Sequence, residues 1–352
     1  DYVFNIDHGS NSSTTTATAF FGAHMGEFNY TPPTGFVAAS SANLPDPTIL
    51  LPNKHFDTVL YSGNASSQTI SIPEFTPDWV WIKKRSGGSN RSHQLYDQVR
   101  GATKLLHSDD SQGEQTASNG LTSFGTKNFA VGSDDGINGS GGAYVGWNWN
   151  AGGSTVTNTD GNISSQVRAN TTAGFSIVGY SGNGSNGQTV GHGLGVAPDA
   201  IILKARGASQ NWRVWHKSLA ADGSKRLLLD STNASEDASF LNDTAPTSTV
   251  FTLGNSDDAW NASGGTYITY LFSEVAGYSK FGSYTGNGNA DGTFVFTGFR
   301  PAFIITKRSD GTSPWRLFDN KRPDANFQTY KLEADSSGAE LTGYAYADFL
   351  SN

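Results

Sequence analysis

The sequence contains, at residues 75–83, the stretch Phe75-Thr76-Pro77-Asp78-Trp79-Val80-Trp81-Ile82-Lys83. The same pattern, a proline followed by an apolar run that ends in lysine, occurs twice more. The two further copies are Val196-Ala197-Pro198-Asp199-Ala200-Ile201-Ile202-Leu203-Lys204 and Phe299-Arg300-Pro301-Ala302-Phe303-Ile304-Ile305-Thr306-Lys307. Proline is tolerated at the first position of a strand, where the ladder needs no donor. The apolar run that follows indicates a strand buried on both faces. The pattern therefore predicts three similar buried strands.

A second motif precedes each of these strands. It is Tyr61-Ser62-Gly63-Asn64, then Tyr180-Ser181-Gly182-Asn183, then Tyr284-Thr285-Gly286-Asn287. Each copy follows a strand-like run, at residues 56–60, 175–179 and 280–283. A Gly-Asn pair after such a run predicts a strand that enters a tight turn.

A third motif occurs in only two copies. Gly141–Trp149 and Gly264–Phe272 each begin with Gly-Gly and continue with aromatic residues at alternate positions. This alternation predicts a strand with one aromatic face. The third copy lacks the motif, so we expect that either the native chain continues or another subunit completes its sheet.

These recurrences predict an all-β protein of tandem β-sandwich domains, of jelly-roll or concanavalin-like type. We place the repeats at residues 56–173, 174–278 and 279–352, the last one incomplete. Residues 1–55 differ from them and contain the stretch Asn43-Leu44-Pro45-Asp46-Pro47-Thr48. We interpret these residues as the end of a preceding β-domain plus a proline-rich linker.

Composition supports this class and argues against several functions. Charged residues make up 15% of the chain, aromatic residues 12%, and 42 of the 352 residues are glycine. A formal net charge of −8, with no basic run, argues against binding of nucleic acid. The chain has no cysteine, which excludes disulfides. No apolar run reaches the length of a membrane span, so we expect no membrane insertion.

Candidate catalytic and metal sites are weak. The seven histidines show no spacing that places two ligands on one helix face, and the few glutamates form no pairing motif. The clusters Asp134–Gly139 and Asn255–Asp258 could offer oxygens to Ca²⁺ but lack a full ligand set, so a shared structural turn is the favoured interpretation. We therefore assign no catalytic residue, no metal ligand and no cofactor.

Three tryptophans are the candidate ligand-binding residues. Trp212 and Trp215 follow the second apolar strand, and Trp315 follows the third; arginine lies beside Trp212 and beside Trp315. Exposed aromatic and arginine side chains can stack on sugars or anchor protein interfaces. Since the pattern repeats, packing in a core or between domains is the favoured alternative.

Further blocks carry a resemblance to a known family. They are Ala151–Gly161, Gly191–Pro198 and Phe272–Gly282. They resemble a domain family of unknown function that is common in large structural proteins of marine phages, and the likeness covers residues from Phe56 onward. Phe28–Phe36 together with Asn43–Pro45 resembles the end of a SPRY-like or concanavalin-like β-sandwich.

The resemblance implies a virion protein of the tail-fibre type, without catalytic residues. We expect a spacer and host-attachment protein that assembles in the host cytoplasm and acts outside the cell. Its expected partners are other virion proteins, further copies of itself in a homotrimer, and a host cell-surface glycan. The alternatives are a capsid decoration or head-fibre protein, a carbohydrate-active depolymerase and a secreted cellular adhesin.

Overall fold

The computed structural model describes residues 47–323, 327–343 and 345–350. Residues from Thr48 onward form one compact unit. The predicted end of a preceding domain and most of the predicted linker lie at residues 1–46, outside the described residues. Below, the first, second and third segments are residues 56–173, 174–278 and 279–352; their boundaries stay a prediction.

The described chain is almost entirely β, as the sequence predicts. Its helical parts are a 3₁₀ turn, η3 (Pro52–Lys54), and one turn of α-helix, α1 (Asp135–Asn138). Among the residues that the structure describes, sixteen glycines have positive φ, where other residues would be strained, and several of them lie in the turns between strands. The predicted all-β class is therefore confirmed.

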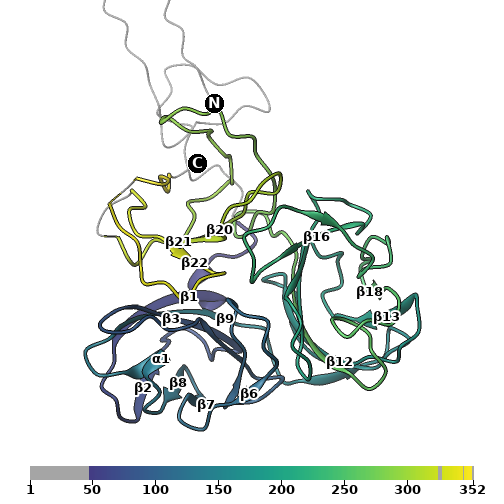
Figure 1. Cartoon of the computed structure of the whole chain (residues 1–352), viewed down its shortest axis with the longest axis horizontal. Coiled ribbons are helices and arrows are strands. Elements are labelled where there is room, and N and C mark those ends of the chain that lie inside the picture. Colours follow the sequence, from purple (N-terminus) through teal and green to yellow (C-terminus); the bar gives the residue numbers. More distant parts are fainter. Residues whose placement is uncertain (1–46, 324–326, 344, 351–352) are drawn as a thin grey trace, which may run out of the picture. The chain divides into compact units, whose positions relative to one another are not determined.

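The first segment is built on a four-stranded antiparallel sheet in the order β1-β9-β3-β4 (Figure 1). Its strands are β1 (Phe56–Ser62), β9 (Ala143–Trp149), β3 (Trp79–Ser86) and β4 (Gln94–Asp97). A smaller sheet, in the order β2-β8-β7, holds β2 (Gln68–Ser71), β8 (Asn128–Val131) and β7 (Leu121–Gly125). A two-stranded sheet pairs β5 (Lys104–Leu105) with β6 (Gln115–Thr116).

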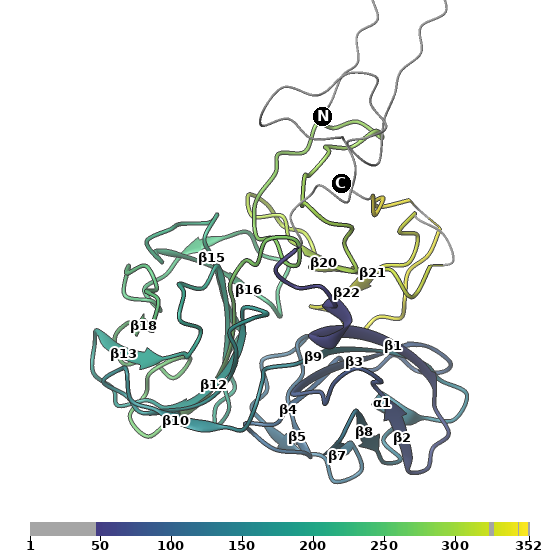
Figure 2. The ribbon, with the colours of Figure 1, turned by 180° about the vertical axis from the view of Figure 1, so that it is seen from behind.

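The second segment contains the same strand order inside a larger sheet. This eight-stranded sheet runs β10-β11-β12-β19-β14-β15-β16-β17, so that β12-β19-β14-β15 corresponds to β1-β9-β3-β4. Two of its strands, β10 (Val156–Asn158) and β11 (Ser165–Asn170), come from the end of the first segment. The others are β12 (Phe175–Ser181), β19 (Thr266–Phe272), β14 (Ala200–Ala205), β15 (Arg213–His216), β16 (Lys225–Leu228) and β17 (Glu236–Asp237). Figure 2 shows β13 (Gln188–Gly191) beside β18 (Val250–Leu253), which pair in a sheet of their own.

The third segment has fewer strands. β20 (Phe303–Thr306), β21 (Arg316–Asp319) and β22 (Leu332–Glu333) form a three-stranded sheet with β20 at its edge. The strand predicted at residues 280–283 is absent, and that prediction is wrong. Its counterparts β1 and β12 each pair along their length with a Gly-Gly strand, β9 or β19, and no such strand lies here among the described residues.

The predicted apolar strands are buried as expected in two of the three segments. The first six residues of β3 and all residues of β14 are buried, whereas every residue of β20 is only half-buried. Alternate side chains of β3 and β14 enter different cores. Trp79 and Trp81 join a central core, while Val80 and Ile82 enter a core within the first segment.

The central core combines side chains from all three segments. It includes Trp79, Trp147, Tyr270 and Trp315. Tyr270 stacks on Trp79, with ring centroids 4.2 Å apart. Of two further cores, one lies within the first segment, and the other is formed mainly by the second segment together with Ile163 and Val167 of the first. The three segments are therefore held together by a shared aromatic centre.

The Gly-Gly strands carry aromatic residues on both faces, which corrects the prediction of a single aromatic face. In β9, Trp147 and Trp149 enter the central core, whereas Tyr144 enters the core of the first segment. β19 behaves in the same way, with Tyr270 on one face and Tyr267 on the other. Tyr144 lies three positions before Trp147, and Tyr267 lies three positions before Tyr270. Because successive side chains of a strand point to opposite faces, an odd separation places the two rings on opposite faces.

Candidate functional site

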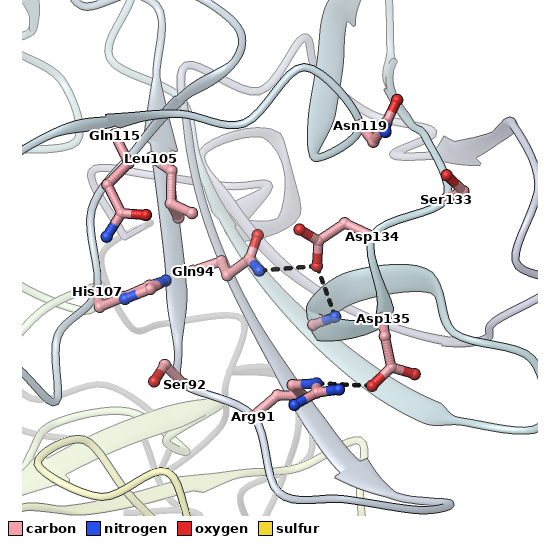
Figure 3. A pocket seen from close by; sticks show the side chains of 11 residues that line it. Arg91, Ser92, Gln94, Leu105, His107, Gln115, Asn119, Ser133, Asp134 and Asp135 are labelled. Atoms are coloured by element: carbon pink, nitrogen blue, oxygen red, sulfur yellow. Dashed lines mark hydrogen bonds and ion pairs between the residues drawn. The ribbon is translucent and has the colours of Figure 1, made fainter.

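A polar pocket of about 450 Å³ opens in the first segment (Figure 3). Its wall consists mainly of amide, hydroxyl and charged side chains, with Leu105 as an apolar member. The lining residues are Arg91, Ser92, Gln94, Leu105, His107, Gln115, Asn119, Ser133, Asp134, Asp135 and Gly136. No Phe, Tyr or Trp side chain is among these lining residues, so a bound sugar would be held mainly by hydrogen bonds.

Asp134 forms one wall of the pocket and also begins α1. Its Oδ1 accepts hydrogen bonds from the main-chain nitrogen of Gly136, at 2.6 Å, and from Nε2 of Gln94, at 3.1 Å. The first of these is an N-cap bond, which satisfies a helix donor that has no other partner. Gln94 in turn accepts a hydrogen bond from the hydroxyl of Tyr96. This side of the pocket is therefore fixed by bonds that also maintain the fold.

Asp135 faces two basic side chains. Its carboxylate lies 3.0 Å from Nζ of Lys84 and 2.7 Å from Nε of Arg91. Hydrogen bonds from Lys84 and then Arg91 lower the pKa of Asp135. The group is therefore ionised at neutral pH and suits the binding of hydroxyl donors better than proton donation.

The tryptophans predicted as ligand-binding residues lie elsewhere. Trp212, Trp215 and Trp315 are 0%, 2% and 6% exposed, so the expectation that their rings are exposed is wrong. Trp212 and Trp315 belong to the central core, and Trp215 belongs to the core of the second segment. Their packing role, the alternative favoured by the sequence, is confirmed. Ligand binding by them stays a prediction with no exposed ring face to support it.

Two of these tryptophans link neighbouring segments through their indole nitrogens. Nε1 of Trp212 donates to the main-chain oxygen of His107, at 2.7 Å, and Nε1 of Trp315 donates to that of Leu228, at 2.8 Å. In the first segment the matching position holds His93, whose Nε2 lies 3.0 Å from the main-chain oxygen of Glu333. The second segment is thus bonded to the first, the third to the second, and the first to the third.

The same position is held within each segment by a half-buried aspartate. The main-chain nitrogens of His93, Trp212 and Trp315 donate to Asp109, Asp230 and Asp335 respectively. The three acceptors of the inter-segment bonds, His107, Leu228 and Glu333, each precede one of these aspartates by two positions. Equivalent residues therefore make equivalent bonds around the three segments.

The lysines that end the three apolar motifs also bond neighbouring segments to each other. Lys83 donates to the main-chain oxygen of Ser337, Lys204 to that of Ser111, and Lys307 to that of Thr232. Lys83 and Lys204 are fully buried, and burial lowers the pKa of each to about 8. Burial also lowers the pKa of Lys307. Such amines are usually exposed, so their burial here indicates a structural role.

Two buried ion pairs were missed by the sequence analysis. Asp97 and Arg100 pair in the first segment, and the hydroxyl of Tyr270 donates to Asp97 at 2.8 Å. In the third segment Asp319 pairs with Arg322, and Nε1 of Trp147 donates to Asp319 at 3.0 Å. Each pair thus binds an aromatic residue of another segment. The sequence feature that could have revealed both ion pairs is the Asp-x-x-Arg spacing, at residues 97–100 and 319–322.

The sequence model of one protein family, described as a domain of unknown function (DUF7483), matches residues 51–352. The chain belongs to this family. No curated protein and no solved structure matches it. The inter-segment bonds and the polar pocket described above therefore both lie inside the DUF7483 domain.

Within the part of this DUF7483 domain that the structure describes, no group of three or more His, Cys, Asp or Glu side chains is placed to hold a metal ion. The Asp/Asn/Gly clusters at residues 134–139 and 255–258 instead form turns, in which Asp134 and Asp257 accept main-chain hydrogen bonds. Among the same residues, no helix combines the length and apolarity needed to cross a membrane.

Proposed function

We propose that this chain is a structural protein of a phage virion, of the tail-fibre type, that serves as a spacer and attaches to the host surface without catalysis. The equivalent bonds that link the three segments carry the proposal. They involve large, fully buried side chains, among them Trp212, Lys204 and Lys83. A shared core with such links resists relative movement of the segments, as a spacer requires.

The resemblance found in the sequence supports the virion assignment. Proteins of that kind act in several copies together, so weak contacts with a surface add to a strong attachment. By the same analogy we propose a homotrimer. The polar pocket of the first segment supports the attachment role, because Gln115, Asn119 and Asp135 offer amide and carboxylate groups to the hydroxyls of a glycan.

Immunogold labelling of purified phage particles tests the virion assignment. An antibody raised against the purified chain is expected to label the distal tail, in a few copies per particle. Dense labelling of the capsid would support the head-decoration alternative. Intact particles in which neither labelling nor peptide mass spectrometry detects the chain would overturn the proposal.

The attachment role is tested by binding of fluorescently labelled protein to host cells. Asn119→Ala with Gln115→Ala is expected to lower cell binding at least tenfold, while Asn90→Ala, an exposed change outside the pocket lining, is expected to leave it unchanged. Equal binding by both variants would remove the pocket from the attachment surface. Release of soluble oligosaccharide from host polysaccharide would contradict the non-catalytic assignment and favour a depolymerase.

A further inference from the structure

The second segment carries two arginines at the place that corresponds to the polar pocket of the first segment. Trp212 occupies the position that His93 has in the first segment, so the residue after it, Arg213, corresponds to the pocket residue Gln94. Gln94 is only 5% exposed and nevertheless lines the pocket (Figure 3). A nearly buried side chain at this position can therefore form the wall of a binding site.

The second arginine, Arg226, corresponds to the pocket residue Leu105. Arg226 of β16 pairs with Glu236 of β17, as Leu105 of β5 pairs with Gln115 of β6. Gln115 also lines the pocket. At these three equivalent positions the first segment has no charge, whereas the second segment has two positive charges and one negative charge. The electrostatics of the two places therefore differ, although their main-chain frame is the same.

Both arginines lie against one aromatic ring, that of Trp260. The guanidinium carbons of Arg213 and Arg226 lie 5.7 Å and 5.8 Å from its ring centroid, within the range of a cation–π contact. Arg213 pairs with Leu228, two positions after Arg226, so both arginine side chains lie on the same face of the sheet. Nε1 of Trp260 donates to the main-chain oxygen of Asn255, at 3.0 Å, which fixes the ring. The two guanidinium groups are thus held near each other.

Among the described residues, one of these arginines has a carboxylate partner and the other has none. Nε of Arg226 lies 3.0 Å from Oε1 of Glu236. Arg213 is 7% exposed; its Nη1 donates to the main-chain oxygen of Asn211, and its Nε is buried without a hydrogen-bond partner. Burial, and then the charge of Arg226, lower the pKa of Arg213, and three carboxylates act in the opposite direction without pairing with it: Asp257, Asp230 and Glu236. A nearly buried cation without a paired anion is costly, and a bound anion would offset that cost.

From these observations we propose that Arg213 and Arg226 form an anion-binding site whose ligand is an acidic glycan. A guanidinium group is planar and donates hydrogen bonds in pairs to the oxygens of an anion. The ligand therefore needs one anionic group, which is either the carboxylate of a uronic acid or the sulfate of a sulfated sugar. The choice of a glycan as the carrier of this group rests on the proposed attachment role. The site itself shares no residue with the pocket of the first segment.

Binding of the purified full chain to three polysaccharides tests the proposal. Polygalacturonate carries carboxylates, dextran sulfate carries sulfates, and dextran carries neither. We expect the chain to bind one or both acidic polymers at least tenfold more tightly than dextran in biolayer interferometry, and to bind them less tightly as salt is added. The net charge of −8 repels polyanions, so such binding requires a local site. Binding of polygalacturonate alone would assign a carboxylate ligand, and binding of dextran sulfate alone a sulfate ligand.

Two single changes locate the site. Arg213→Gln, which gives this position the side chain that the first segment has at Gln94, is expected to weaken binding of the acidic polymer at least tenfold. Arg308→Gln removes the same charge at a surface position outside the site and is the matched control, expected to bind as the unchanged chain does. Circular dichroism checks that each variant is folded. Should Arg213→Gln fail to fold, Arg226→Gln, at a side chain that is 18% exposed, provides the same test.

Four results would overturn the proposal. One is the absence of binding to both acidic polymers. Another is equally tight binding of dextran, which would show that the anionic group is not recognised. The third is unchanged binding by a folded Arg213→Gln variant, which would place the polymer elsewhere. The fourth is equal weakening by Arg213→Gln and Arg308→Gln, which would reduce the effect to net charge. None of these results changes the immunogold labelling of particles, so this inference and the virion assignment can fail separately.

Discussion

The indole nitrogen of Trp212 donates a hydrogen bond to the main-chain oxygen of His107, 105 positions earlier in the chain, at 2.7 Å. Trp212 is fully buried, so its ring fills the central core while its N–H joins the second segment to the first. Trp315 makes the equivalent bond to Leu228. In the second and third segments, the tryptophan at this equivalent position therefore packs in the central core and also bonds its segment to the neighbouring one.

Trp212→Phe should remove this bond and keep most of the ring volume. We expect the free energy of unfolding to fall by about 1–3 kcal/mol, because the buried oxygen of His107 loses its donor. Urea denaturation followed by circular dichroism measures the change. Trp212→Ala should cost more, about 3–5 kcal/mol, because it also leaves a cavity. Unchanged stability of Trp212→Phe would show that the bond contributes nothing.

Arg100→Leu should be among the most damaging single changes in the chain. It leaves the fully buried Asp97 without its cation, a loss that typically costs about 3–5 kcal/mol. Thermal unfolding of the purified variant measures the effect. Arg308 pairs with Asp310 on the surface, so Arg308→Leu is the matched control and should show no measurable change. Equal stability of the two variants would contradict a structural role for the buried pair.

Lys204 should make stability depend on pH in the alkaline range. Burial lowers the pKa of Lys204 from 10.5 to about 8, so between these values the unfolded chain binds a proton that the folded chain does not. The free energy of unfolding should therefore rise as the pH increases from about 8 towards 10. Denaturation at pH 7.5 and 9.5 tests this. Lys204→Met should show a smaller rise, whereas Lys54→Met, an exposed change, should keep it.

A substitution that removes the amide of Asn138 should destabilise the folded chain. Its Nδ2 donates to the main-chain oxygens of Ser66 and Gly132, and its Oδ1 accepts from the main-chain nitrogen of Asn64. Each buried group left without a partner costs about 1–3 kcal/mol, so Asn138→Ala should lower the melting temperature by several degrees. Calorimetry of this variant beside Asn90→Ala, an exposed change, checks the prediction. Similar melting temperatures would count against it.

Asn261 shows how far such roles could be read from the sequence. It lies three residues before Gly264, as Asn138 lies three before Gly141, and its Nδ2 donates to the main-chain oxygens of Ser185 and Gly254. The recurrence of the asparagine was visible along the chain. Its bonds were not, because Ser185 lies 76 positions earlier and becomes a neighbour only when the strands pair.

The polar pocket was also beyond the reach of the sequence. Arg91, His107 and Asp134 come from three separate loops, and only Asp134 belongs to a cluster that the sequence analysis singled out. The exposure of Trp212 was judged wrongly for a related reason. Tryptophan next to arginine occurs both on binding surfaces and in cores, and only the arrangement of the other segments places this ring inside.

The sequence by itself determined the all-β class, the buried strands at residues 79–86 and 200–205, and the recurrence of motifs along the chain. These follow from local alternation, apolar runs and turn residues, which act within a few residues of each other. Only the tertiary structure decided that the segments share one aromatic core, that Trp212 is bonded to His107, and that Lys204 is fully buried. Burial and main-chain pairing depend on which distant strands meet, and local pattern alone does not specify that meeting.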